Sequence, residues 1–171
     1  MIKILLLCIL CSLIIFIAYK LSCYYKQRQM LFENLCEFCN YMQTEIGFLK
    51  TDITGSINKF NNCSSKDFSK VLKLYLTTLK QSQNFYDDFM ESLSKLNILK
   101  TNEKEKICSF FDSLGKSNLQ EQIAQIENFK NDFMAELSSA KDDNKKYGTV
   151  FFTVPFFFLT NIVLLCKKYF T

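Results

Sequence analysis

The sequence of 171 residues has no histidine, one proline and four glycines. Without histidine it lacks the commonest general acid or base of enzyme active sites. It has no histidine, and Cys8 and Cys11, which could pair with Cys36 and Cys39, lie in an apolar segment, so it has no ligand set for zinc. Its glycines form neither a phosphate-binding loop nor a nucleophile elbow. Because proline and glycine interrupt helices, their scarcity favours long helices. We therefore predict a helical, non-enzymatic protein without a metal or cofactor.

Charge is nearly balanced along the middle of the chain. Between Lys20 and Lys146 lie 18 basic and 17 acidic residues, a net charge of about +1. A protein that binds nucleic acid would normally present a basic face, so we expect no nucleic-acid partner. Three carboxylate pairs fall on polar helix faces or in turns, where we predict solvated side chains: Asp87 with Asp88, Glu103 with Glu105, and Asp142 with Asp143.

The eight cysteines show no disulfide-like framework, which is typical of a protein from a reducing compartment. Cys36 and Cys39 form a Cys-x-x-Cys sequence on one predicted helix. We interpret both as packing residues. The alternative is a thiol-redox pair, a hypothesis that replacing both with serine would test.

Two apolar segments, 4–22 and 147–166, predict membrane-spanning helices, since about twenty apolar residues match the hydrocarbon core of a bilayer. In the first, Ile4 to Tyr19 is continuously apolar. A cleaved signal peptide is its main alternative, but no small-residue cleavage site follows. A lipoprotein signal ending at Cys23 is disfavoured because Lys20 stands where a small aliphatic residue is wanted.

Basic residues near the two segments predict the orientation. Six flank the central region and three the outer ends, which favours a cytoplasmic central region because basic residues accumulate on the cytoplasmic side. The inner residues are Lys20, Lys26, Arg28, Lys141, Lys145 and Lys146, and the outer ones are Lys3, Lys167 and Lys168.

Between residues 29 and 146 the apolar residues recur at helical spacing, and no segment alternates like a strand. We predict an all-α, antiparallel bundle of five to six helices. Thr51-Asp52 is expected to cap the second helix, Asn102 with Glu105 the fifth, and Ser117 or Asn118 the last. That last helix carries an apolar stripe made of Leu119, Ile123, Ile126, Phe133, Leu137 and Ala140.

Three short motifs and their spacing match a known family. They are Arg28-Gln29 through Thr44-Glu45-Ile46; Phe111-Asp112-Ser113-Leu114-Gly115 followed by Asn118 and Gln122; and Lys146-Tyr147-Gly148. Over essentially its full length the chain resembles the stage III sporulation protein AB family, whose soluble domain is similar to the cytoplasmic helical domain of the type II secretion F protein. The family usually has Asp at the position of Asn118.

The resemblance implies a two-pass platform in the mother-cell membrane facing the forespore. Its partners would be a cytoplasmic secretion-type ATPase, the stage III sporulation protein AA, other membrane proteins of the same channel-like complex, and membrane lipid; self-association is compatible with this role. The alternatives are an assembly platform of a non-sporulation secretion or pilus system, or a membrane-anchored extracytoplasmic helical binding protein. The positions expected to fix bundle geometry or contact a partner are Glu45, Leu114, Gly115, Asn118 and Gln122.

Overall fold

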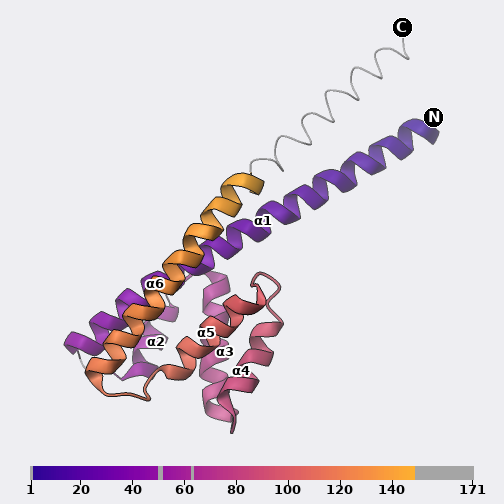
Figure 1. Cartoon of the computed structure of the whole chain (residues 1–171). Helices are drawn as coiled ribbons and strands as arrows, with labels where there is room; N and C mark the ends of the chain where they lie inside the picture. Colours follow the sequence, from indigo (N-terminus) through magenta and orange to yellow (C-terminus); the bar gives the residue numbers. More distant parts are fainter. Residues whose placement is uncertain (1, 50–51, 63, 149–171) are drawn as a thin grey trace. The chain divides into compact units, whose positions relative to one another are not determined.

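The computed structural model describes residues 2–49, 52–62 and 64–148, without the side chains of residues 2–5, 7, 8, 11, 48 and 49. These residues form helices and no strands, which confirms the all-α prediction (Figure 1). The helices are α1 (Ile2–Thr44), α2 (Ile53–Asn61), α3 (Lys66–Gln81), α4 (Phe85–Ser94), α5 (Thr101–Ser113) and α6 (Leu119–Asp143), with π-helical turns η1 (Glu45–Leu49) and η2 (Asn144–Gly148).

The chain divides into two compact units. One comprises Met1–Lys26 with Ala140–Thr171, and the other Gln27–Ser139. The helix α1 continues without a break through the apolar segment and the first predicted bundle helix, so these are one element.

Neither predicted membrane span is established by the structure. Across the residues that it describes, we find no helix with the length and hydropathy that crossing a membrane requires. The second predicted span, 147–166, lies outside the described residues except for Tyr147 and Gly148. Both spans therefore stay predictions.

Helix starts follow local capping. Asp52 caps α2, accepting a hydrogen bond from the Gly55 backbone N–H, and Ser65 caps α3. The prediction for α5 is wrong: the helix begins two residues before Asn102 would allow, because Glu103 accepts a hydrogen bond from the backbone N–H of Lys100 at 2.9 Å. That hydrogen bond places Glu103, rather than Glu105, in the first turn.

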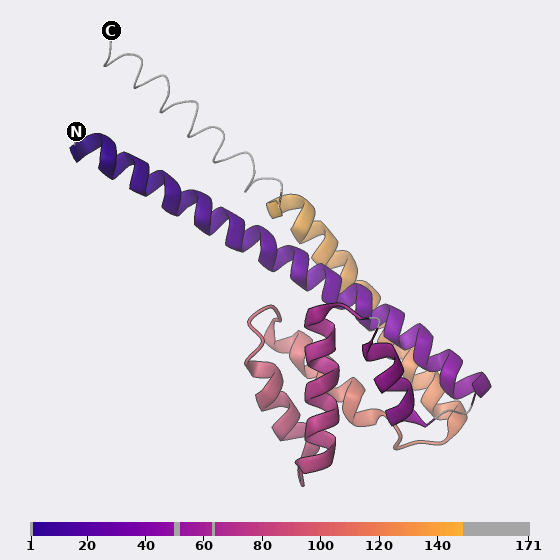
Figure 2. The ribbon, with the colours of Figure 1, turned by 180° about the vertical axis from the view of Figure 1, so that it is seen from behind.

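An aromatic core holds the unit Gln27–Ser139 together. Phe38 on α1 is fully buried, and its ring lies 5.2–6.1 Å from four other phenylalanine rings, those of Phe60, Phe68, Phe110 and Phe111. The ring of Phe111 stacks on Phe38 and the other three meet it edge-to-face, and both arrangements add to the free energy gained from burial. Because the five rings come from α1, α2, α3 and α5, they fix four helices around one point. Figures 1 and 2 show the ribbons of these helices from opposite sides.

Candidate functional site

Glu45, the first predicted site residue, lies in the turn η1 and is 7% exposed. Its carboxylate accepts a hydrogen bond of 3.5 Å from the Ser56 hydroxyl and lies 3.9 Å from the Lys59 ammonium. Both partners are on α2, three residues apart and therefore on one helix face. Asp52 caps the start of α2, and the contacts of Glu45 with Ser56 and Lys59 hold the turn η1 against this helix.

The turn between α5 and α6 holds three further predicted residues. Leu114 ends α5 in an extended conformation and is buried, whereas Gly115 has φ +80°, a conformation that side chains with a Cβ rarely adopt. A Cβ on Gly115 would also lie 3.2 Å from Cδ1 of Ile53 on α2. The backbone conformation of the turn favours glycine, and a Cβ would also require the Ile53 side chain to shift by a few tenths of an ångström.

Asn118 and Gln122 anchor the start of α6. The Asn118 side chain accepts a hydrogen bond from the Glu121 backbone N–H at 3.0 Å, and its carbonyl accepts one from the Gln122 backbone N–H. The Gln122 amide oxygen in turn accepts a hydrogen bond from the Gly115 backbone N–H at 2.8 Å. Gln122 is 3% exposed, and its Nε2 has no hydrogen-bond partner among the residues that the structure describes.

Two of the predicted residues, Glu45 and Gly115, lie close to the N-terminal part of α2. The structure joins Gly115 to Gln122 directly, brings Gly115 close to Ile53 of α2, and links Glu45 to Ser56 of the same helix. Their capping and packing roles are plain from this geometry, while a role in binding a partner stays a prediction.

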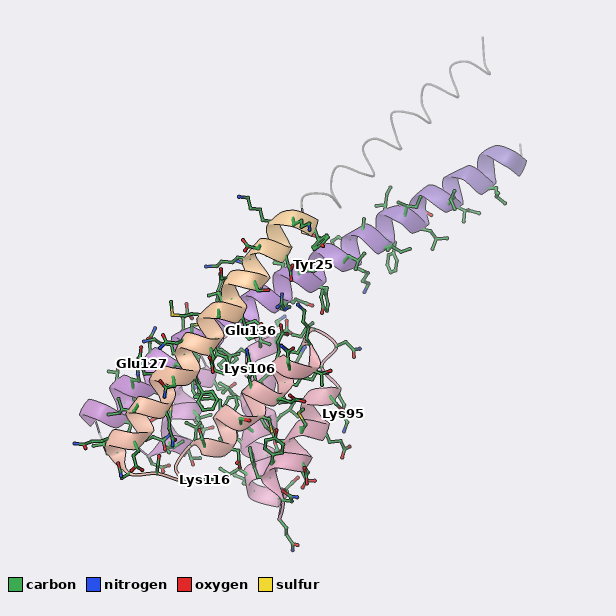
Figure 3. All side chains as sticks on the ribbon, viewed as in Figure 1. Tyr25, Lys95, Lys106, Lys116, Glu127 and Glu136 are labelled. Atoms are coloured by element: carbon green, nitrogen blue, oxygen red, sulfur yellow. The ribbon has the colours of Figure 1, made fainter. Side chains whose placement is uncertain are left out.

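A buried ionic network was missed by the sequence analysis. Arg28 on α1 donates hydrogen bonds from Nε and Nη2 to Oε1 of Glu103 on α5, at 2.9 and 2.6 Å, and both residues are at most 1% exposed. Glu136 on α6 lies 3.8 Å from Arg28 Nη2 and accepts a 2.5 Å hydrogen bond from Lys106 Nζ (Figure 3). One network thus links α1, α5 and α6.

Two predictions fail at this network. Glu103 was expected to be solvated and is fully buried, while Arg28, counted as a membrane-flanking charge, is paired inside the bundle. The available signal was spacing: Arg28 precedes Leu31 and Leu35 by three and seven residues and so belongs to their buried stripe.

Burial and hydrogen bonding shift several pKa values. Burial raises the pKa of the Cys39 thiol to about 12, with a further contribution from neighbouring Cys36. The hydrogen bond to Glu136 raises the pKa of Lys106. Reactive redox cysteines have lowered pKa values, so the state of Cys39 favours a packing role. The described residues contain no cluster of three or more His, Cys, Asp or Glu side chains suited to holding a metal.

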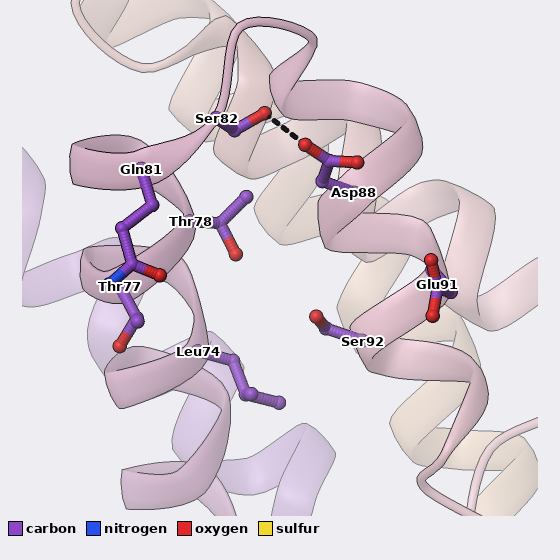
Figure 4. Close-up of a pocket in the computed structure, with 8 residues that line it drawn as sticks. All are labelled: Leu74, Thr77, Thr78, Gln81, Ser82, Asp88, Glu91 and Ser92. Carbon is purple, nitrogen blue, oxygen red and sulfur yellow. Dashed lines mark hydrogen bonds between the residues drawn. The ribbon is translucent and has the colours of Figure 1, made fainter.

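An open groove of about 320 Å³ lies between α3 and α4 (Figure 4). The hydroxyl of Ser82 donates a hydrogen bond to the Asp88 carboxylate across one end. The other lining residues are Leu74, Thr77, Thr78, Gln81, Glu91 and Ser92. Hydroxyls, an amide and two carboxylates line this groove, and it contains none of the predicted site residues.

Comparison with known protein families gives a match over most of the chain. A family model described as stage III sporulation protein AB matches residues 3–165. No curated protein and no solved structure matches the chain significantly.

Proposed function

Because the chain belongs to the stage III sporulation protein AB family, we propose that it serves sporulation as a non-enzymatic, membrane-attached adaptor. The family match, which extends across both predicted membrane segments and the bundle, carries the proposal. The adaptor couples a cytoplasmic secretion-type ATPase, the stage III sporulation protein AA, to other membrane proteins of the same complex.

Exposed apolar side chains support membrane attachment. Leu13, Phe16 and Ile17 of α1 are 52–58% exposed, and with Ile15 they point to different sides of the helix. A helix that packs in a soluble bundle exposes apolar residues on at most one side. The remaining large exposed apolar side chains before Tyr19 are Leu6, Ile9 and Leu10. An apolar surface on all sides of a helix fits the interior of a bilayer.

The buried ionic network between helices of the bundle supports coupling. Both α1 and α6 contribute residues to the two compact units, and within the bundle they share the ionic network of Arg28, Glu103 and Glu136. Breaking a buried ion pair is strongly unfavourable. A partner that moves the bundle would therefore move α1 and α6 with it, because separating these helices would break the network.

Orientation is the first test, because an ATPase in the cytoplasm requires a cytoplasmic bundle. Single cysteines replace Lys95, whose side chain is 72% exposed, and Thr171, in a variant without the native cysteines. Intact cells are treated with a membrane-impermeant maleimide. We expect labelling of Thr171→Cys in intact cells and of Lys95→Cys only after lysis. Labelling of Lys95→Cys in intact cells would place the bundle outside and refute ATPase coupling.

The second test is recovery of the ATPase. The tagged full-length chain is purified in detergent from cross-linked sporulating cells, and the bound proteins are identified by mass spectrometry. We expect the secretion-type ATPase among them. Its absence, together with recovery of other membrane proteins of the complex, would contradict the coupling role and leave the sporulation role intact.

A further inference from the structure

We propose that six side chains next to the exposed apolar stretch of α1 form a binding surface for the phosphate groups of anionic phospholipids. The inference rests on the membrane attachment proposed above, and specifies the lipid that this attachment selects. All six belong to the compact unit that combines Met1–Lys26 with Ala140–Thr171. We call them the tyrosine–lysine collar: Lys20, Tyr24, Tyr25, Lys26, Lys146 and Tyr147.

The tyrosines join two distant parts of the sequence. The rings of Tyr25 on α1 and Tyr147 in η2 stack with centroids 5.2 Å apart and planes at 20°. Tyr24 packs edge-on against Tyr25 at 5.3 Å. Figure 3 labels Tyr25 in this cluster. Tyrosine combines an apolar ring with a polar hydroxyl and is enriched where hydrocarbon meets headgroups. The cluster therefore suits the interface of a bilayer.

The lysines place positive charge beside these rings. Lys20, Lys26 and Lys146 are exposed. The Lys146 ammonium lies 5.2 Å from the centre of the Tyr147 ring, and that of Lys20 lies 5.6 Å from the centre of the Phe16 ring. An ammonium over a ring edge or face still has N–H groups to donate to phosphate oxygens.

The sign of the local charge favours anionic lipid. Residues 12–26 and 140–148 contain five lysines and two aspartates. Each lysine near an anionic bilayer strengthens binding by about fivefold. The position of the lysine agrees with this charge, since exposed Phe16 and Ile17 precede Lys20 by about one helical turn. When those two side chains enter hydrocarbon, the lysine reaches the phosphate layer.

The test uses tryptophan, which the chain lacks. Full-length Tyr24→Trp is reconstituted into vesicles of phosphatidylcholine mixed with phosphatidylglycerol, in which one or the other lipid carries bromine to quench the fluorescence. We expect stronger quenching by brominated phosphatidylglycerol, corresponding to a preference of at least about fivefold at low salt. The preference should fall in high salt, and when Lys20, Lys26 and Lys146 are all replaced by glutamine.

A matched variant controls for net charge. It replaces three exposed bundle lysines, Lys70, Lys95 and Lys116, by glutamine and should keep the preference. Equal quenching by both lipids would overturn the inference while leaving membrane attachment standing. A preference that survives loss of the collar lysines would overturn the assignment to this surface. Quenching by neither lipid would instead refute the membrane attachment on which the inference depends.

Discussion

Arg28 Nε and Nη2 both donate to one carboxylate oxygen of Glu103, at 2.9 and 2.6 Å, across 75 positions of sequence and with neither side chain exposed to solvent beyond 1%. The other carboxylate oxygen of Glu103, Oε2, accepts a hydrogen bond from the Lys100 backbone N–H. A single carboxylate thus caps α5 and pairs with α1.

We expect Glu103→Leu to lower the free energy of unfolding by about 3–5 kcal/mol, because it leaves Arg28 buried without its main partner. Chemical denaturation of the full chain in detergent, followed by circular dichroism, measures the change. Glu105→Leu, at an exposed position of the same helix, should change it by less than about 0.5 kcal/mol. The double variant Arg28→Met/Glu103→Leu should recover most of the loss. A double variant as unstable as the sum of its single variants would contradict a coupled pair.

Gly115 and Gly55 should respond to alanine with opposite signs. Gly115 has φ +80° and a close neighbour in Ile53, so Gly115→Ala is expected to destabilise the protein by about 1–2 kcal/mol. Gly55 lies in α2 with open space where a Cβ would be, so Gly55→Ala should stabilise it by about 0.5–1 kcal/mol. The same denaturation measurement tests both substitutions. Equal changes in the free energy of unfolding would contradict the argument from backbone conformation.

Asn118 distinguishes capping from partner binding. Asn118→Ala removes the acceptor for the Glu121 backbone N–H and should cost about 1 kcal/mol of stability, whereas Asn118→Asp keeps the acceptor and should cost little. If the amount of ATPase that copurifies falls only in the variant that loses stability, Asn118 acts as a helix cap. A loss of ATPase binding in the stable Asn118→Asp variant would show a direct contact instead.

Cys39 should resist alkylation in the folded protein. Its thiol is fully buried with a pKa raised to about 12, whereas Cys36 is half-buried. We expect iodoacetamide at pH 8 to modify Cys36 well before Cys39, as read by mass spectrometry of native and denatured samples. Rapid modification of Cys39 in the native protein would revive the thiol-redox hypothesis.

Glu127 should contribute to acid sensitivity. Hydrogen bonds from Lys130 and Gln43 lower its pKa in the folded protein. The contribution of Glu127 to the free energy of unfolding is therefore fully present above the ordinary pKa of a glutamate. It is lost as the pH falls through the lowered pKa of the folded protein. Stability measured between neutral and strongly acidic pH should fall less steeply in Glu127→Gln than in the unchanged chain. Glu121→Gln, which removes an exposed carboxylate from the same helix, is the comparison.

The predicted helices agree with the structure where the signal is local. Asp52 and Asn118 accept hydrogen bonds from backbone N–H groups three residues later, an arrangement that a few neighbouring residues determine by themselves. The start of α5 was misplaced because two glutamates, Glu103 and Glu105, stand at cap-compatible spacings. Only the distant Arg28 distinguishes them, by pairing with Glu103.

The sequence by itself determined the helical class, since its scarce glycines and proline leave long stretches in which apolar residues recur with the period of a helix. Its motif spacing was also enough to indicate the family. Tertiary structure alone decided which partners the buried charged residues find. The spacing of Arg28 places it on a buried helix stripe, but its pairing with Glu103 joins helices that are 75 positions apart in the sequence. Burial of a polar group is acceptable only where a partner satisfies it, and folding is what brings such partners together.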